Sequence, residues 1–229
     1  MIEPVVIDVK NCIEKYSFVV HPKGLRVVEE FVIAYMKMYS DVYFHKTTRG
    51  VQHMVTRIIV LALRDAPEQF SDHSIAKFLL DETSRNLDFY LSLDDSSIVS
   101  LIRHIAEKNI GEASILARRY LERDLFKCLE VPPKPDGEPQ SQLLKRFKAK
   151  LDENKVFHVI DVVAGRSYKQ YDVADKKYLE NILIKQGQEH DRLHGVSKII
   201  KSIPSQATRI YFRTEQDREI ARRLLKEAA

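Results

Sequence analysis

The sequence predicts a mostly α-helical chain with a short N-terminal β-hairpin and a small C-terminal α/β unit. Apolar residues recur at intervals of three and four between residues 25 and 129, as in amphipathic helices. A proline-dense segment then interrupts the chain, and apolar runs rich in β-branched residues follow it. The 229 residues are 44% hydrophobic and 31% charged, which is ordinary for a soluble protein of one large domain or two small ones.

The first twenty residues favour a small hairpin. Residues 4–9 and 16–20 have high β-propensity, and the segment 21–24 breaks the chain after them. The start of the chain lacks the basic and apolar regions of a secretory signal. No apolar run reaches the roughly 18 residues of a membrane span, so we expect no membrane partner.

The proline-free stretch after the hairpin predicts two helices, over residues 25–39 and 42–65. Ser40 or Asp41 is suited to cap the second helix, and Pro67 stops it. The apolar residues that define the helical spacing are Val28, Phe31, Val32, Tyr35, Tyr39, Val51, Met54, Val55, Ile58, Ile59, Ala62 and Leu63.

Shorter helices are expected further along. Ser71 or Asp72 is placed to cap one of them, and Asp94 is placed to cap another. The apolar residues of the latter are Ile98, Leu101, Ile102 and Ile105. We expect Gly111 to end it, and a further helix to cover about residues 112–123.

The proline-dense segment divides the chain. Residues 132–139 contain four prolines, which exclude regular structure. We therefore expect a helical region with its hairpin at 1–131, a linker and a helix at 132–154, and an α/β subdomain at 155–229. The subdomain has β-type runs and helical patterns at 156–163, 195–202, 208–212 and 215–228.

Charge is distributed unevenly. Residues 1–129 carry 17 basic and 18 acidic side chains, whereas residues 130–229 carry 20 and 15. The basic part is suited to attract a nucleotide, a nucleic acid or an acidic subunit face, and the alternative is a solvated, lysine-rich surface. The two cysteines belong to no metal-binding spacing, which indicates a reduced, cytoplasmic protein.

Common catalytic motifs do not occur in the sequence. It has no Gly-x-Gly-x-x-Gly, P-loop, Gly-x-Ser-x-Gly or Cys-x-x-Cys pattern. His190 and His194 have the i, i+4 spacing of two metal ligands on a helix, with Asp191 beside them. The surrounding stretch is polar throughout, so we interpret it as an exposed loop or a helix start and assign no metal ligand there.

The segment between residues 35 and 49 is more unusual. Three tyrosines at spacings of four predict one aromatic stripe, and His45, Lys46 and Arg49 follow them closely. Tyrosine can stack on bases, whereas lysine and arginine bind phosphate, so these residues suit a nucleotide site. The alternative is a packed helix with amphipathic tyrosines and a solvated basic edge.

This segment resembles the helix after the catalytic core of HD-family nucleotide phosphohydrolases. The residues that carry the resemblance are Tyr39, Val42, Tyr43, Phe44, His45, Lys46, Thr47 and Arg49. Two later segments are similar to the family in order and spacing, at residues 89–95 and 117–127. The late segment that ends at residues 209–212 is similar to the family's C-terminal subdomain.

The resemblance implies metal-assisted hydrolysis of nucleoside or deoxynucleoside triphosphates to nucleoside and triphosphate. In the family a His, a His-Asp pair and a later Asp hold the metal, and this chain matches sequence that follows them. No catalytic residue and no metal ligand are therefore assigned here. The divalent metal is expected in an HD half that this chain lacks, so the chain should be inactive alone. The alternatives are that the chain is a fragment, one half of a split gene or a degenerate paralogue.

The resemblance also implies roles for individual residues. Tyr43, with Tyr39 one turn earlier, would line the substrate pocket. His45 and Lys46 match a pair that contacts a regulatory nucleotide at the oligomer interface, and Lys23 matches a basic residue of that region.

Arg49 is placed to join this regulatory group. Tyr35 and Phe44 depart from the animal enzyme's pattern, which has an arginine and a glutamine there, so the substrate preference stays open. Expected partners are a nucleotide, the HD half and further copies of the chain. The alternative function is a non-catalytic oligomerisation or regulatory module that binds nucleic acid through the basic C-terminal part.

Overall fold

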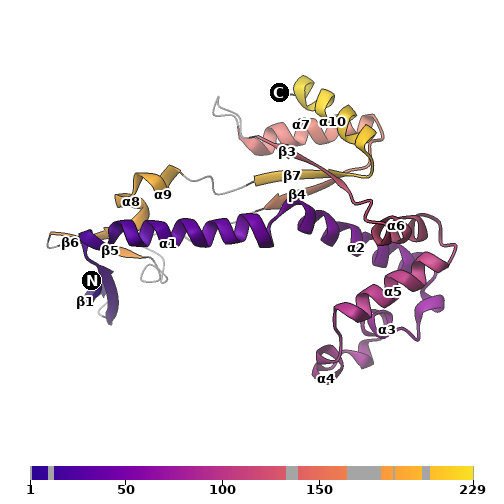
Figure 1. The fold of residues 1–229 in the computed structure, drawn as a ribbon, viewed down its shortest axis with the longest axis horizontal. Helices are drawn as coiled ribbons and strands as arrows, with labels where there is room; N and C mark the ends of the chain where they lie inside the picture. Colours follow the sequence, from indigo (N-terminus) through magenta and orange to yellow (C-terminus); the bar gives the residue numbers. More distant parts are fainter. Residues whose placement is uncertain are drawn as a thin grey trace. The chain divides into compact units, whose positions relative to one another are not determined.

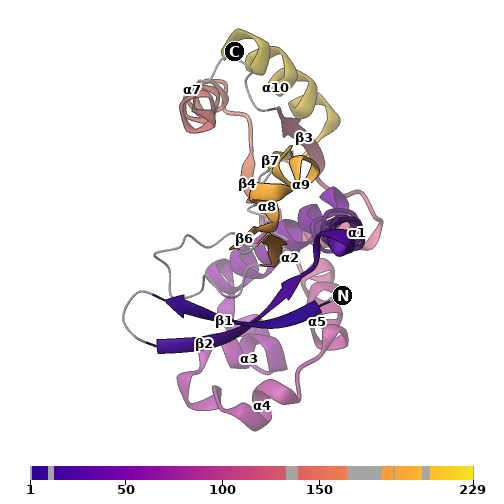
Figure 2. The ribbon, with the colours of Figure 1, turned by 90° about the vertical axis from the view of Figure 1, so that its left-hand side faces the viewer.

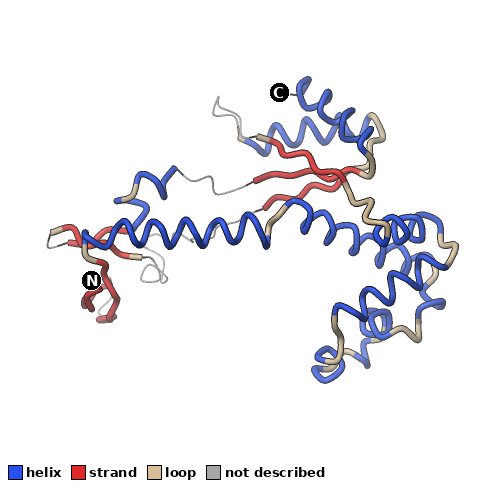
Figure 3. The backbone as a smooth tube through the Cα atoms, in the orientation of Figure 1, coloured by secondary structure: helices blue, strands red, loops and turns tan. Residues whose placement is uncertain are grey.

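The computed structural model describes residues 2–9, 13–132, 139–163, 182–187, 189–202 and 207–228. The chain forms two compact units that interleave along the sequence. The first contains Met1–His45 and Val162–Ala207, and the second contains Lys46–Asp161 and Thr208–Ala229. Most of the described residues are helical and the sheets are small, which confirms the predicted fold class (Figure 3). The prolines at the centre of the expected linker, within residues 133–138, lie outside the described residues.

The first unit contains the predicted hairpin. Strands β1 (Ile2–Val9) and β2 (Ile13–Val20) pair antiparallel, as Figure 2 shows. β2 pairs parallel with β5 (Leu183–Gln186), which pairs antiparallel with β6 (Glu189–Arg192). The sheet order is therefore β1-β2-β5-β6.

The helices of the first unit pack on this sheet through a small apolar core. They are η1 (Pro22–Gly24), α1 (Leu25–Met38), the π-helical turn η2 (Tyr39–Tyr43), α8 (Leu193–Val196) and α9 (Lys198–Ser202). The buried core residues are Val32, Ile184, Leu193 and Ile200. The expected helix over 195–202 is divided at Ser197, whose hydroxyl donates to Glu29 on α1 at 2.5 Å.

The second unit begins with a helical layer. Its helices are α2 (Lys46–Asp65), η3 (Pro67–Phe70), α3 (Ser74–Leu80), η4 (Glu82–Ser84), α4 (Leu87–Leu91), α5 (Asp95–Glu107) and α6 (Gly111–Leu121). The predicted cap of α5 is confirmed, because the Asp94 carboxylate accepts the amide of Ser97 in a capping box.

Three other boundaries differ from the prediction. His73 precedes α3 without any side-chain cap, so Ser71 and Asp72 do not cap it. α5 ends at Glu107, and Gly111 instead begins α6 with a positive φ of 43°. The helix expected from residue 42 begins at Lys46, because a π-helical turn takes up Ser40 and Asp41.

A three-stranded sheet completes the second unit. β3 (Lys127–Val131), β7 (Ala207–Phe212) and β4 (Val159–Val163) lie in the order β3-β7-β4. Helices α7 (Gln140–Glu153) and α10 (Glu215–Ala228) lie side by side on one face (Figure 1). Ile210 and Phe212 point into this helix-covered core, whereas Tyr211 between them packs with α2 on the other face. β3 was not predicted from the sequence.

None of the helices in the described part of the chain is both long and apolar enough to cross a membrane.

Candidate functional site

An aromatic ladder runs along α1 and into η2. The ring centroids of Tyr35 and Tyr39 lie 4.8 Å apart, and those of Tyr39 and Tyr43 lie 5.1 Å apart. Phe31 extends the ladder at 6.3 Å from Tyr35, and Phe44 lies 5.7 Å from Tyr39. These spacings suit favourable aromatic pairs, and the expected tyrosine stripe is present. The side chains at the two ends of the ladder are exposed to solvent, Phe31 to 64% and Tyr43 to 54%.

The ladder ends in an irregular turn. The Phe44 amide donates to the Tyr39 carbonyl at 2.7 Å, the long-range bond of a π-helix. Such turns are rare and occur often at functional sites. Phe44 itself has a non-helical conformation (φ −106°, ψ 19°), and α2 begins two residues later. His45 therefore precedes α2, whereas Arg49 lies within it.

The expected regulatory residues Lys23, His45 and Lys46 do not form one group along α1. His45 and Lys46 are exposed neighbours; His45 ends the first unit and Lys46 begins the second. Lys23 is exposed in η1, before α1. The 14 residues of α1 span about 21 Å, so Lys23 and Tyr43 lie at opposite ends of this helix within one chain.

Arg49 contacts a buried carboxylate. Its Nε and Nη2 donate to Asp161 on β4 at 3.0 and 2.6 Å, and its Nη1 donates to Gln52 at 2.8 Å. Asp161 is only 4% exposed. Burial opposes its ionisation, but the hydrogen bonds and the charge of Arg49, with a smaller contribution from His53, together hold the pKa of Asp161 below its usual range.

Tyr211 packs against the same stretch of α2. Its hydroxyl donates to the main-chain oxygen of Lys46 at 2.9 Å, and its ring lies against Gly50. The His53 ring lies 5.4 Å from the Tyr211 ring, and its Nε2 lies 3.5 Å from Oδ1 of Asp161. Burial raises the pKa of the Tyr211 phenol, which keeps the hydroxyl protonated well above neutral pH.

A second charged group in this unit surrounds Phe157. The guanidinium carbons of Arg57 and Arg213 lie 4.8 and 4.3 Å from the centre of its ring. Both arginines also donate to Glu112, at 2.8 and 2.5 Å. Burial raises the pKa of Glu112, but the two arginines outweigh burial, so its pKa lies below the usual range.

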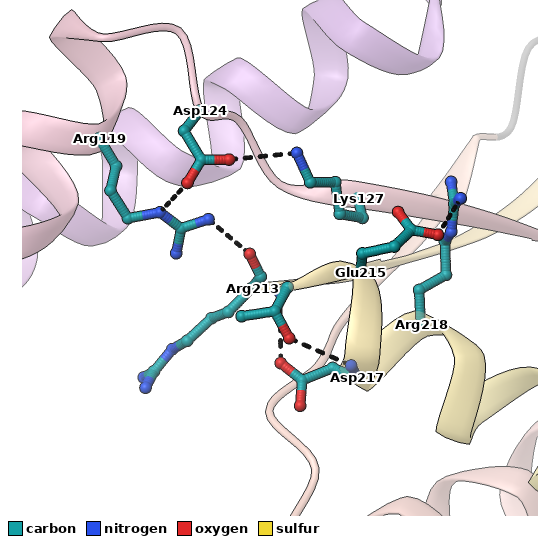
Figure 4. A network of polar contacts seen from close by, with 8 residues as sticks. Arg119, Asp124, Lys127, Arg213, Glu215, Asp217 and Arg218 are labelled. Carbon is teal, nitrogen blue, oxygen red and sulfur yellow. Dashed lines mark hydrogen bonds and ion pairs between the residues drawn. The ribbon is translucent and has the colours of Figure 1, made fainter.

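A polar network holds the turn between β7 and α10. Arg119 donates to the carbonyl of Arg213 at 2.5 Å and to Asp124 at 2.8 Å. Figure 4 shows both contacts. Lys127 donates to the same Asp124 at 3.1 Å. A phosphate at this place would have to compete with Asp124 for both cations.

The His190-Asp191 pair does not lie in a loop or at a helix start. It belongs to strand β6, where His190 pairs with Lys185 and Asp191 pairs with Ile184 of β5. The prediction of a loop or a helix start at this position is therefore wrong, because these polar residues pair with β5 as a strand. In the ranges that the structure describes, no three His, Cys, Asp or Glu side chains come close enough to hold a metal ion.

Neither Asp161 nor Tyr211 was predicted as a site residue from the sequence. The sequence does contain an indication for Asp161, since it is the only acidic residue in the apolar run 156–163. A carboxylate inside such a run requires a buried partner, and Arg49 is that partner. Tyr211 left no comparable signal, because a tyrosine in a strand is ordinary.

Solved structures with this fold are known. A phosphohydrolase from Bacteroides thetaiotaomicron matches 86% of this chain with a TM-score of 0.52 and 19% identity, over 52% of its own length. A hypothetical protein from Aquifex aeolicus matches 93% of this chain with a TM-score of 0.52 and 22% identity, over 47% of its length. At these identities the similarity shows the fold alone.

The comparisons define an HD-domain-related protein. A family model described as "HD associated region" matches residues 7–131, more than half of the sequence, so the chain belongs to this family. The uncharacterized protein YwfO of Bacillus subtilis is 26% identical over 190 residues, which are 82% of this chain and 44% of that protein. The chain thus spans about half the length of the relatives it matches.

Proposed function

We propose that this chain is the C-terminal portion of a metal-dependent HD phosphohydrolase that acts on nucleoside or deoxynucleoside triphosphates. In the complete enzyme it contributes one wall of the nucleotide pocket and much of the oligomer interface. The family membership and the phosphohydrolase with the same fold support this proposal.

One observation carries the proposal. The exposed end of an aromatic ladder, Tyr43, is followed within three residues by the exposed donors His45 and Lys46. A base can stack on such a ring, and a phosphate attracts such donors. In our proposal Tyr43 and Tyr39 serve the substrate, whereas His45 and Lys46 serve a regulatory nucleotide.

Lys23 belongs to the regulatory group only if several chains assemble. It lies about 21 Å along α1 from the ladder's end, too far to share one nucleotide within a chain. A site shared between copies would combine Lys23 of one copy with Lys46 of another. The proposal therefore includes a homo-oligomer.

The metal is assigned to the HD half and to no residue of this chain. Carboxylate and imidazole ligands must converge on a divalent ion, and no such group of three occurs among the described residues. His190 and Asp191 lie in strand β6 and do not supply a site. In our proposal the HD half carries out the hydrolysis, and this chain contributes binding and assembly.

Nucleic acid is the less favoured partner. Some basic side chains of the C-terminal part are paired with acidic side chains of the chain itself. The pairs on or beside α10 are Arg218 with Glu215, Arg222 with Glu219, and Lys150 with Glu227. A regulatory module that binds nucleic acid would be expected to present unpaired cations.

The test compares the chain with a reconstituted protein. The isolated chain is assayed with Mg²⁺ or Mn²⁺ and each deoxynucleoside triphosphate, and then again after fusion to the HD half of a full-length relative. We expect triphosphate release only from the fusion. Clear release by the pure isolated chain, or none by a folded and metal-loaded fusion, would refute the proposal.

A further inference from the structure

Two residues of the second unit's sheet hold the start of α2, where Lys46 lies. We infer that Asp161 and Tyr211 are positioning residues for Lys46, and that Arg49 links α2 to Asp161 instead of contacting phosphate itself. The inference rests on the proposed function, in which Lys46 binds the phosphate of a regulatory nucleotide.

Tyr211 holds Lys46 through the main chain. Its hydroxyl donates to the Lys46 carbonyl at 2.9 Å, and its fully buried ring packs on Gly50, one turn further along α2. Removal of the hydroxyl alone would release the carbonyl and leave the ring packing in place. The side chain of Lys46 remains exposed, so this bond orients the residue without occupying its ammonium group.

Asp161 holds the next part of the helix through Arg49. All three guanidinium nitrogens of Arg49 have protein partners, two on Asp161 and one on Gln52. Asp161 is almost fully buried, and its carboxylate also lies 3.5 Å from Nε2 of His53. A buried, charge-assisted pair of this geometry fixes a helix more firmly than a surface pair does.

The positioning residues Asp161 and Tyr211 (the two anchors of α2) lie near the points where the chain leaves the second unit and returns to it. Lys46 is the first residue of that unit, Asp161 is the last before the chain leaves it, and Tyr211 follows its return at Thr208. The two anchors come from neighbouring elements of one sheet, β4 and β7. The C-terminal strand β7 is thus linked to the residue that is proposed to bind phosphate.

The two possible roles of Arg49 predict opposite effects of one substitution. If Arg49 were a phosphate ligand, Asp161→Asn would free its guanidinium and strengthen phosphate binding. If Arg49 positions α2, the same change weakens the pair and reduces binding. Tyr211→Phe adds a second, milder variant that keeps the packing.

The probe is inorganic triphosphate, titrated into the full chain at low salt and followed by chemical-shift changes in NMR spectra. All variants are first shown to be folded at the titration temperature by circular dichroism.

Lys46→Ala should raise Kd at least about tenfold, as expected for the loss of one charge-assisted bond. Asp161→Asn and Tyr211→Phe should each raise Kd about three- to tenfold. The matched controls Glu130→Gln and Tyr120→Phe should leave Kd unchanged, since Glu130 pairs with Arg209 in the same sheet and Tyr120 lies on α6.

Double variants separate positioning from general destabilisation. If Asp161 and Tyr211 act through Lys46, their substitutions should have no further effect on Kd in the Lys46→Ala background. Unchanged or tighter binding by both single variants, or full additivity with Lys46→Ala, would overturn the inference while the role of Lys46 stands. Equal binding by wild type and Lys46→Ala would refute the proposed regulatory role of Lys46, and the inference with it.

Discussion

The ring of Tyr211 lies so close to Gly50 that a β-carbon added to this glycine would be 3.0 Å from Cε1 of the ring. The glycine lies inside α2, where alanine would otherwise be preferred by about 1 kcal/mol. The ring cannot move away easily, because it is fully buried and its hydroxyl is bonded to Lys46. Close helix–sheet packing therefore accounts for a glycine at this position.

Gly50→Ala should destabilise the second unit by about 1 kcal/mol. Overpacking typically costs about 1–3 kcal/mol, and the better helix propensity of alanine offsets part of it. Urea unfolding followed by circular dichroism measures the difference. In a Tyr211→Leu background the same substitution should be neutral or stabilising, and a destabilisation of equal size there would show that the ring is not the cause.

Replacement of Lys155 by glycine is expected to stabilise the fold. It follows α7 in the left-handed region, with φ 52°, where side chains other than glycine are strained by about 1–2 kcal/mol. Lys155→Gly should raise stability by about 0.5 kcal/mol, because relief of the strain exceeds the cost of the greater unfolded-state entropy of glycine. Asn154→Gly is the control, because Asn154 has φ −85° and should lose stability. A loss of stability in Lys155→Gly would contradict this account of the turn.

The Arg49–Asp161 pair should make stability depend on pH. The pKa of Asp161 is lower in the folded than in the unfolded chain, so its contribution is present above the ordinary value of about 3.9 and is lost as pH falls below it. Asp161→Asn should cost about 2–3 kcal/mol at pH 7. This is less than for a fully buried pair, because the Arg49 side chain is 28% exposed.

The gap in unfolding free energy between wild type and Asp161→Asn should therefore narrow as pH is lowered from 6 toward 3. Glu130→Gln should show little change, because Glu130 is exposed. A gap that stays constant over this range would exclude ionisation of Asp161 as the source of the stabilisation.

The exposed face of α1 and η2 should drive self-association. Its large apolar side chains are Val27, Phe31, Tyr35, Met38, Val42 and Tyr43. Exposed apolar patches of several hundred Å² usually find a partner. We expect light scattering to detect dimers or larger species at tens of micromolar (a rough working range). Phe31→Glu should shift the chain toward monomer, whereas the control Leu87→Glu should not, although Leu87 on α4 is at least as exposed as Phe31. A wild-type monomer at this concentration would contradict the expectation.

The sequence predicted the elements whose signals are local. The hairpin, the cap of α5 at Asp94 and strand β7 depend on propensity, capping and alternation, and all three are confirmed. The start of α2 was predicted four residues too early. Ser40 and Asp41 look like caps in the sequence, but the helix widens into a π-turn instead.

The parts that were missed depend on distant partners. Strand β3 exists because it pairs with β7, more than 70 residues later, and the residues before it look like the end of a helix. The ion pair of Arg49 joins residues 112 positions apart, so spacing along the sequence could not show it. The tyrosine ladder, in contrast, follows from spacings of four and was predicted correctly as a stripe.

The most direct test of the account separates Tyr43 from Lys46 in a reconstituted enzyme. With the HD half restored, substrate and activating nucleotide are titrated independently for Tyr43→Phe and Lys46→Ala. Lys46→Ala should weaken activation about tenfold or more and leave turnover at saturating activator near that of wild type, because one charge-assisted phosphate contact is lost. Tyr43→Phe should instead change turnover or KM for the substrate and leave activation intact. If both variants match wild type in both titrations, the segment is structural and the proposed nucleotide sites are wrong.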